Sequence, residues 1–401
     1  MRISKIGAIV PLLLTGGLLI AACSSNSSSS TTTTSGSTTS GATVSVATFN
    51  KNFTTMADLK NIAAAGHGKI AVILPDTVSS ARYTEFDAPY LAKAFAEAGL
   101  STSDTIIQNA QGVDSTQLTD AQSDITSGAT VLVVDPLDSG VGTSIETYAT
   151  AHGVPVVDYD RLVLGGSRKY YVSFDNVKVG TLIGKGMVSC VAAWKVAKPT
   201  MAVMVGAPTD NNATLFAQGY NAVLSPLVAS GAYKVVAHPA GTWDPPTALT
   251  EFQQAYTANP TMNAVLVPND ENAAPIITYL KTLNIPAKKF PVTGQDATLV
   301  GLQNIISGYQ CGTAYKPIFL EAQAAASLAL YLRAGKTPPA SLVNGTVKDT
   351  TENKLVPSSL LIPEWVTPTN MESTVIADGF VPASQLCAGA YAADCATYGI
   401  H

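Results

Sequence analysis

Hydrogen-bonding side chains follow the ends of short apolar runs along this 401-residue chain. Seven of eight such runs break off into an Asp or Asn, and the eighth ends in His238. Nine side chains at or near these run ends combine pure donors, pure acceptors and flat aromatic rings. They are Arg82, Tyr83, Asp160, Arg161, Asn212, Trp243, Asn269, Asp296 and Lys316.

These residue types suit a small molecule that carries several hydroxyl groups. Arg and Lys only donate hydrogen bonds, carboxylates only accept them, and Asn does both. The guanidinium fork can hold two adjacent oxygens, and aromatic rings can cover apolar C–H faces. We expect two Arg and one Lys to neutralise Asp160 and Asp296, so that no buried charge in the site is left unpaired. The pattern therefore favours a polar, uncharged ligand, such as a sugar.

Structural roles compete with this interpretation at single positions. An Asp or Asn after a strand is often only a turn residue or a helix N-cap. This alternative applies to Asp76, Asp138, Asp210, Asp270 and Asp175–Asn176. Asp160–Arg161 could also be a surface pair, Trp243 a core residue and Lys316 an exposed turn residue. The joint occurrence of all nine at strand ends carries more weight than any one of them.

The apolar runs themselves predict parallel strands. They are rich in Val and Ile and show little alternation, as expected of strands buried on both faces. The runs are 69–76, 130–138, 154–161, 169–176, 200–212, 234–238, 263–270 and 290–296. Helical patterns separate them, at 88–98, 116–126, 141–152, 177–194, 213–229, 248–258, 272–283 and 318–334. The alternation predicts βαβ units, too many for one ordinary sheet, and ligands bind at the carboxyl ends of such strands.

Composition and missing motifs exclude several classes of function. The chain is 46% hydrophobic and 13% charged, with a net charge of −5, so a nucleic-acid partner is not expected. The common hydrolase, phosphate-loop, zinc-protease and dinucleotide motifs are absent. Asp160 and Asp296 could be imagined as a glycosidase pair, but neighbouring cations favour two ionised acceptors. We therefore expect neither an enzyme nor a cofactor.

The N-terminus has the pattern of an export signal. Arg2 and Lys5 precede an apolar stretch at 6–22, which ends in Ile-Ala-Ala before Cys23. This ending resembles a bacterial lipobox and implies a lipid on Cys23, with a plain signal peptide or a membrane helix as alternatives. The Ser- and Thr-rich residues that follow cannot form a core and predict a tether. The folded part is thus expected on the outer face of the cytoplasmic membrane.

The chain has four further cysteines. An even number suggests that they form disulfides, as expected of a protein in an oxidising compartment. Cys387 and Cys395 are the simplest pair, and Cys190 with Cys311 would follow, although spacing alone does not establish the connectivity. A metal site is not expected, because no Cys-x-x-Cys occurs and the four His are scattered.

At these residues the chain resembles the D-xylose-binding protein family, within the type I periplasmic sugar-binding proteins. Matching blocks occur in order over roughly 68–385, and the sequence 44–67 falls outside them. They include ARYTEFD, VDYDRLV, YVSFDNVKVG, APTDNNATLFAQG, GTWDPPTAL, NDENAA, GQDATLVGLQNIISGYQ and YKPI. The resemblance implies two α/β lobes with parallel sheets, three crossovers and a monosaccharide held by the nine residues above. Tyr83 stands where the family pattern has Trp, and the four later cysteines look like additions.

Together these observations predict a domain plan and a function. The parts are a signal peptide (1–22), a tether (23–45), a leader with one short helix (46–67), an N-terminal lobe (68–173 plus 317–359) and a C-terminal lobe (174–316 plus 360–401). The resemblance implies a monomeric receptor that delivers a monosaccharide, D-xylose first, to the membrane permease of an ABC importer. A sugar sensor that engages a chemoreceptor or kinase is the alternative. A repressor of the same fold and a secreted carbohydrate enzyme fit the chain less well.

Overall fold

The computed structural model describes residues 44–401. The predicted signal peptide, Cys23 and the part of the tether before residue 44 lie outside the described residues. Within 44–401, no helix is both long enough and apolar enough to cross a membrane.

Seven strands form a first sheet, in the order β11-β12-β5-β4-β3-β1-β2. The strands are β1 Lys69–Leu74, β2 Thr105–Asn109, β3 Ala129–Val134, β4 Val156–Tyr159, β5 Tyr170–Phe174, β11 Gly345–Asp349 and β12 Lys354–Leu361. All neighbours are parallel except β11 and β12, which form an antiparallel pair. Strand β2 was not predicted, because it is half-buried throughout and so carries no continuous apolar run.

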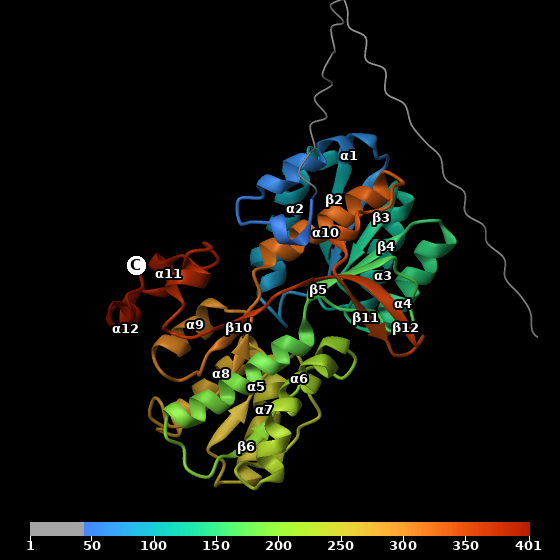
Figure 1. Ribbon diagram of the computed structural model, residues 1–401. Helices are drawn as coiled ribbons and strands as arrows, with labels where there is room; N and C mark the ends of the chain where they lie inside the picture. Colours follow the sequence, from blue (N-terminus) through green and yellow to red (C-terminus); the bar gives the residue numbers. More distant parts are fainter. Residues whose placement is uncertain (1–43) are drawn as a thin grey trace, which may run out of the picture. The chain divides into compact units, whose positions relative to one another are not determined.

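Helices cover both faces of this sheet (Figure 1). Successive residues of a strand point to opposite faces, so Ile70 and Val72 join one core cluster and Ala71 and Ile73 another. The first cluster includes α2 Ala88–Glu97 and α10 Ile318–Arg333, and the second includes α3 Asp114–Thr126 and α4 Ser139–Ala151. We call this sheet and its helices the first lobe.

The second lobe is built from six shorter strands. They are β6 Thr200–Val203, β7 Lys234–Ala237, β8 Ala264–Leu266, β9 Gly294–Gln295, β10 Thr313–Tyr315 and β13 Glu364–Val366. Strands β7-β6-β8 and β13-β10-β9 each form a three-stranded sheet, and a parallel bridge between Val265 and Val292 joins the two. Only β13 pairs antiparallel with its neighbour.

Five helices complete the second lobe: α5 Asn176–Ala193, α6 Asn211–Ala229, α7 Pro245–Ala258, α8 Asp270–Thr282 and α9 Leu299–Ile306. Helices α5 and α6 touch backbone to backbone where Gly180 meets Gly219. A Cβ at Gly180 would lie 2.0 Å from the carbonyl oxygen of Phe216, so only glycine permits this contact. Helix α9 was not predicted separately.

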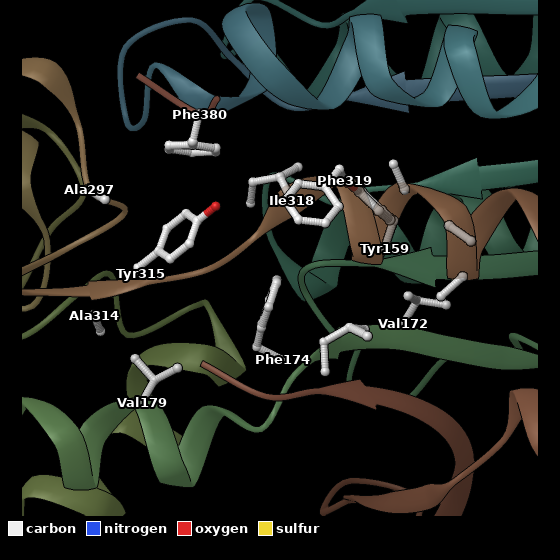
Figure 2. Packing of buried hydrophobic residues seen from close by; sticks show 14 of the residues in the cluster. Tyr159, Val172, Phe174, Val179, Ala297, Ala314, Tyr315, Ile318, Phe319 and Phe380 are labelled. Carbon is white, nitrogen blue, oxygen red and sulfur yellow. The ribbon is translucent and has the colours of Figure 1, made fainter. Parts of the chain in front are cut away.

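The chain passes between the lobes three times, as expected of the type I fold. The crossovers follow β5, β10 and β12. Phe174 still pairs with Leu361 in the first sheet, so the observed crossovers lie slightly later than the predicted boundaries of 173/174 and 359/360. Around the crossovers, Phe174, Val179, Tyr315 and Ile318 belong to one buried cluster that includes both lobes (Figure 2).

The leader packs against the first lobe, and the C-terminal segment packs mainly against the second lobe. The leader contains η1 Val46–Thr48, η2 Thr54–Leu59 and α1 Lys60–Ala65, and its Phe53 and Met56 are fully buried. It packs against α2 and α10. The C-terminal segment contains η6 Glu372–Ile376, α11 Ala383–Leu386, η7 Gly389–Tyr391 and α12 Ala392–Tyr398, and α11 and α12 pack against α9.

Candidate functional site

All nine residues singled out in the sequence line one small cavity. Its walls come from both lobes. Arg82, Tyr83, Asp160 and Arg161 follow strands of the first lobe, and the other five belong to the second lobe or to the crossover after β10.

Arg82 stands at the N-cap of the short π-helix η3 Tyr83–Asp87 and is held by three carboxylates. Its Nη1 donates to Asp160 at 2.8 Å, its Nε and Nη2 donate to Asp87 at 2.8 and 2.7 Å, and Nη2 also donates to Glu321 at 2.6 Å. Asp87 and Glu321 are completely buried. The guanidinium is therefore fixed in orientation before any ligand arrives.

Asp160 is an ionised acceptor on a strained backbone. It directly follows β4 and has a φ of +54°, in the left-handed region that residues other than glycine rarely adopt. Burial alone would raise the pKa of its carboxyl, but the charges of Arg82, Lys316 and Arg161 lower that pKa to about 2. The side chain thus accepts hydrogen bonds throughout the physiological pH range.

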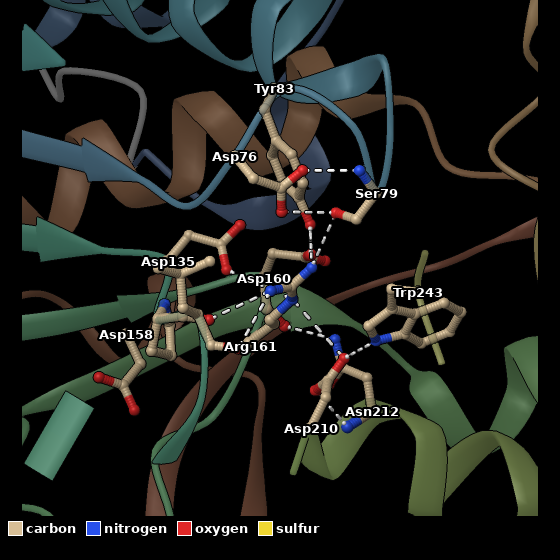
Figure 3. Close-up of polar contacts among 12 residues, drawn as sticks. Asp76, Ser79, Tyr83, Asp135, Asp158, Asp160, Arg161, Asp210, Asn212 and Trp243 are labelled. Carbon is tan, nitrogen blue, oxygen red and sulfur yellow. Dashed lines mark hydrogen bonds and ion pairs between the residues drawn. The ribbon is translucent and has the colours of Figure 1, made fainter. Parts of the chain in front are cut away.

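Arg161 and Tyr83 meet across the first-lobe wall (Figure 3). Arg161 Nη2 donates to the Tyr83 hydroxyl at 3.0 Å, and that hydroxyl donates to Asp160 Oδ2 at 3.2 Å. Arg161 Nε lies 3.7 Å from Asp135 and 3.6 Å from Asp210. The pair Asp160–Arg161 is thus buried in the wall, and the alternative of a surface pair is wrong.

The second-lobe wall begins at α6. Asp210 caps this helix by accepting from the backbone N–H of Asn212, and it also accepts from Trp243 Nε1 at 3.0 Å. Asn212 Nδ2 donates to the backbone carbonyl of Asp160 at 2.9 Å and so ties the two lobes together. Trp243 is half-buried and lines the cavity beside Phe216.

Lys316 and Asp296 form the ion pair on the far side of the cavity. Lys316 Nζ lies 3.0 Å from Asp296 Oδ1 and 3.8 Å from Asp160 Oδ1. Burial alone would lower the pKa of the Lys316 ammonium, but the two carboxylates raise it. Lys316 is only 3% exposed, so the alternative of an exposed turn lysine is wrong.

Asn269 joins α8 to the first lobe. Its Oδ1 caps α8, and its Nδ2 donates to the backbone carbonyl of Ser79 at 3.1 Å. The neighbouring Glu271 accepts from the Ala81 backbone N–H at 2.9 Å and lies 3.1 Å from the Ser80 hydroxyl. These bonds hold the loop before η3 against the second lobe.

The site contains more carboxylates than the sequence predicted. Around Arg82, Arg161 and Lys316 lie the predicted carboxylates Asp160 and Asp296 and the further carboxylates Asp87, Asp135, Asp210, Glu271 and Glu321. Burial, together with Asp160 and Asp87, outweighs the attraction of Arg82 and raises the pKa of Glu321 to about 8. Burial raises the pKa of Asp135, Asp210 and Glu271 as well. Arg82 and Lys316 do pair with Asp160 and Asp296 as expected, but residues distant in sequence bring additional carboxylates that the sequence did not predict.

Several cavity residues were not predicted as ligands: Ser79, Ser80, Asp210, Phe216 and Gln295. A signal for two of them was present. Phe216 lies four residues after Asn212, on the same face of α6, and Gln295 directly precedes Asp296. The buried Gln295 Oε1 has no hydrogen-bond partner among the described residues and is an available acceptor.

Some of the structural alternatives proved right. Asp138, Asp175 and Asp210 each cap a helix, and Asp76 accepts from the backbone of Val78 and Ser79 in a turn. Asp270 caps no helix. It is buried and accepts from Thr298, Gln310 and Thr313, and its pKa is raised by burial to about 7.

The cysteines are paired as Cys190–Cys311 and Cys387–Cys395. The first bridge joins α5 to the segment before β10, and the second closes a loop in the C-terminal segment. Within residues 44–401, no group of three or more His, Cys, Asp or Glu side chains could hold a metal ion.

Comparison with known proteins places the chain in a family. Residues 70–337 match the periplasmic binding protein domain. The D-xylose-binding periplasmic protein of Escherichia coli is 38% identical over 70% of this chain and 82% of its own length. The multiple sugar-binding periplasmic receptor ChvE of Rhizobium radiobacter is 32% identical over 80% of this chain and 93% of its own.

A solved structure shows the same architecture. The solute-binding protein of a carbohydrate transporter from Chloroflexus aurantiacus, in complex with D-glucose, superposes with a TM-score of 0.70. It is 26% identical and covers 79% of this chain and 97% of its own. The chain therefore belongs to the type I periplasmic sugar-binding proteins, whose fold of two lobes and three crossovers it shares.

Proposed function

We propose that this protein is the solute-binding lipoprotein of an ABC sugar importer and holds one monosaccharide between its lobes. The observation that carries the proposal is the cavity, into which both lobes bring donors, acceptors and aromatic rings. Arg82, Arg161 and Lys316 supply donors, whereas Asp160, Asp296 and Gln295 supply acceptors. No chemistry on the sugar is required of any of them.

Such a site selects for hydroxyl groups. Its charged hydrogen-bonding groups are buried, so an analogue that lacks a matching hydroxyl leaves one of them unpaired. Trp243 and Tyr83 offer rings against which the C–H faces of a sugar can pack. The ligand is expected to be small, because the cavity that these side chains line is itself small.

D-Xylose is the first candidate, since two relatives at 38% identity are named as D-xylose-binding proteins. Other relatives are named for several sugars, and the Chloroflexus structure holds D-glucose. Tyr83 adds a hydroxyl where the family pattern has Trp, and this hydroxyl hydrogen-bonds to both Asp160 and Arg161. It adds a polar group to the wall that a Trp ring would not offer, so sugar preference is expected to depend on this residue.

Transport follows from opening and closing about the crossovers. A sugar that contacts both lobes binds the closed form better and shifts the population toward it. The permease would then recognise the closed form. Periplasmic binding proteins are exported, and a lipid on Cys23 would keep this one close to the permease, as a monomer on the outer face of the membrane.

The test is calorimetric titration of residues 44–401 with xylose, glucose, ribose and arabinose. We expect one of these sugars to bind with a dissociation constant in the micromolar range or below. If none of these sugars, nor any other monosaccharide, gives binding heat, the substrate class is wrong. The lipid anchor is tested separately: Cys23→Ser should move the full-length protein from the membrane fraction to the soluble fraction.

A sensor role is the second candidate, because one relative at 32% identity is named a receptor. The same closed form would then engage a membrane receptor. Deleting the partner permease distinguishes the two roles: uptake of the sugar stops in a transporter, whereas a sugar-induced response persists in a sensor.

A further inference from the structure

The C-terminal segment, residues 371–401, follows residues 70–337, which match the periplasmic binding protein domain, and its Phe380 contacts an aromatic residue of each lobe. Phe380 of this segment stacks on Phe86, with ring centroids 3.8 Å apart and planes 13° from parallel. The same ring meets Tyr315 edge to face at 5.0 Å. Figure 2 shows Phe380 above Tyr315, and the two rings belong to one buried cluster.

Each of the two rings that Phe380 touches is close in sequence to a cavity residue. Phe86 lies on η3, three residues after Tyr83, and Arg82 is the N-cap of the same helix. Tyr315 ends β10, and the next residue is Lys316. Phe380 therefore connects the element that carries Arg82 and Tyr83 to the strand that carries Lys316.

Helix η3 is a five-residue π-helical turn that continues directly into α2, and turns of this kind are rare and often occur at functional sites. Arg82 and Lys316 both contact Asp160, so a small rotation of η3 would move one donor relative to the other. Binding groups of this kind work only when their orientation is locked by packing.

The segment is itself firmly attached. Met371, Val375 and Leu386 are completely buried, and the Cys387–Cys395 disulfide closes a short loop near the end of the segment. Asp378 accepts a hydrogen bond of 3.0 Å from the Tyr315 hydroxyl. On the other side, Lys51 of the leader donates to the backbone carbonyl of Ala377. The stack is thus supported by contacts to the second lobe and to the leader.

We propose that Phe380 is a positioning residue for the binding site and that the C-terminal segment orients η3 through the Phe380–Phe86 stack. Removing the ring leaves η3 free to shift, so that Arg82 and Tyr83 no longer face Lys316 across the cavity. The effect on affinity rests on the proposed sugar binding. The effect on η3 does not, and it can be measured without any ligand.

The experiment compares three variants with the unsubstituted protein. Phe380→Ala removes the ring, and Phe380→Leu keeps an apolar side chain in its place. Leu386→Ala is the matched control, because it removes a buried apolar side chain from the same segment at a position outside the stack. Circular dichroism checks that each variant is folded. Hydrogen exchange is followed over residues 81–90, and calorimetry measures the affinity for whichever sugar binds.

In Phe380→Ala we expect faster exchange in η3 and affinity that is weaker by about tenfold. Phe380→Leu should recover most of both, and Leu386→Ala should change affinity by less than about twofold. The proposal is overturned if Phe380→Ala binds as tightly as the unsubstituted protein, or if Leu386→Ala weakens binding to the same extent. If the unsubstituted protein binds no sugar, the proposed function fails, and unchanged exchange in η3 would then refute the positioning role independently.

Discussion

At the scale of single residues, two buried arginines close in sequence serve different purposes. Arg161 lines the cavity and donates to the Tyr83 hydroxyl. Arg168 lies seven residues later, also with a buried side chain, but it pairs with Asp349 and Asp158, and it is not among the cavity residues. Substituting each of these two arginines in turn therefore distinguishes an effect on ligand binding from an effect on stability.

Arg161→Ala should weaken sugar binding by about 2–5 kcal/mol, because it removes charged hydrogen bonds in a buried site. Arg168→Ala should lower the melting temperature, since it leaves Asp349 and Asp158 without their cation, yet keep the affinity within about twofold. Calorimetry and thermal denaturation of both variants check this. Equal affinity in Arg161→Ala and the unsubstituted protein would remove Arg161 from the site.

At the scale of elements, the two disulfides close loops of very different length. Cys190 and Cys311 are 121 residues apart and join α5 to the start of β10, whereas Cys387 and Cys395 are 8 apart within the C-terminal segment. A crosslink stabilises mainly by restricting the unfolded chain, and the restriction grows with the length of the loop.

Replacing Cys190 and Cys311 by Ala should therefore lower the free energy of unfolding by about 5 kcal/mol, against about 2.5 kcal/mol for Cys387 and Cys395. Urea denaturation of the two double variants, under oxidising conditions, measures the difference. A larger loss from the short loop would show that local packing of the C-terminal segment outweighs chain entropy.

At the scale of the whole molecule, the excess of buried carboxylates links stability to pH. Glu321 has a pKa of about 8, raised from 4.5 first by burial, so the folded protein retains a proton that the unfolded chain releases at lower pH. Its contribution is complete below about pH 4.5 and is lost as the pH rises toward 8. The contribution of Asp160 to the pH dependence of stability has the opposite sign, because its pKa is lowered on folding. It affects stability only below about pH 4.

The melting temperature should therefore fall by at least about 3 °C between pH 5 and pH 8. Glu321→Gln should reduce this dependence, because a neutral amide cannot lose a proton, whereas the other carboxylates with raised pKa values remain. The exposed Glu97→Gln is the control and should leave the profile unchanged. Differential scanning calorimetry of the three proteins between pH 5 and pH 8 measures these melting temperatures. A melting temperature that rises with pH would contradict the role given to Glu321.

The sequence alone was enough for much of the fold and for the nine cavity residues. Continuous apolar runs and helical periodicity are local signals, and the carboxyl ends of parallel strands meet at one edge of a sheet. Arg82, Asp160 and Lys316 could therefore be grouped from strand ends and from the family resemblance. Strand β2 was not predicted, because its residues are all half-buried and lack the continuous apolar run that indicates a buried strand.

Only the tertiary structure decided which distant groups surround those nine. Glu321 reaches Arg82 across 239 residues of chain, and Phe380 stacks on Phe86 from the far C-terminal segment. No local pattern marks such partners, because they are selected by the packing of whole elements. The sequence thus indicated which side chains line the cavity, whereas the fold determined which carboxylates and aromatic rings surround them.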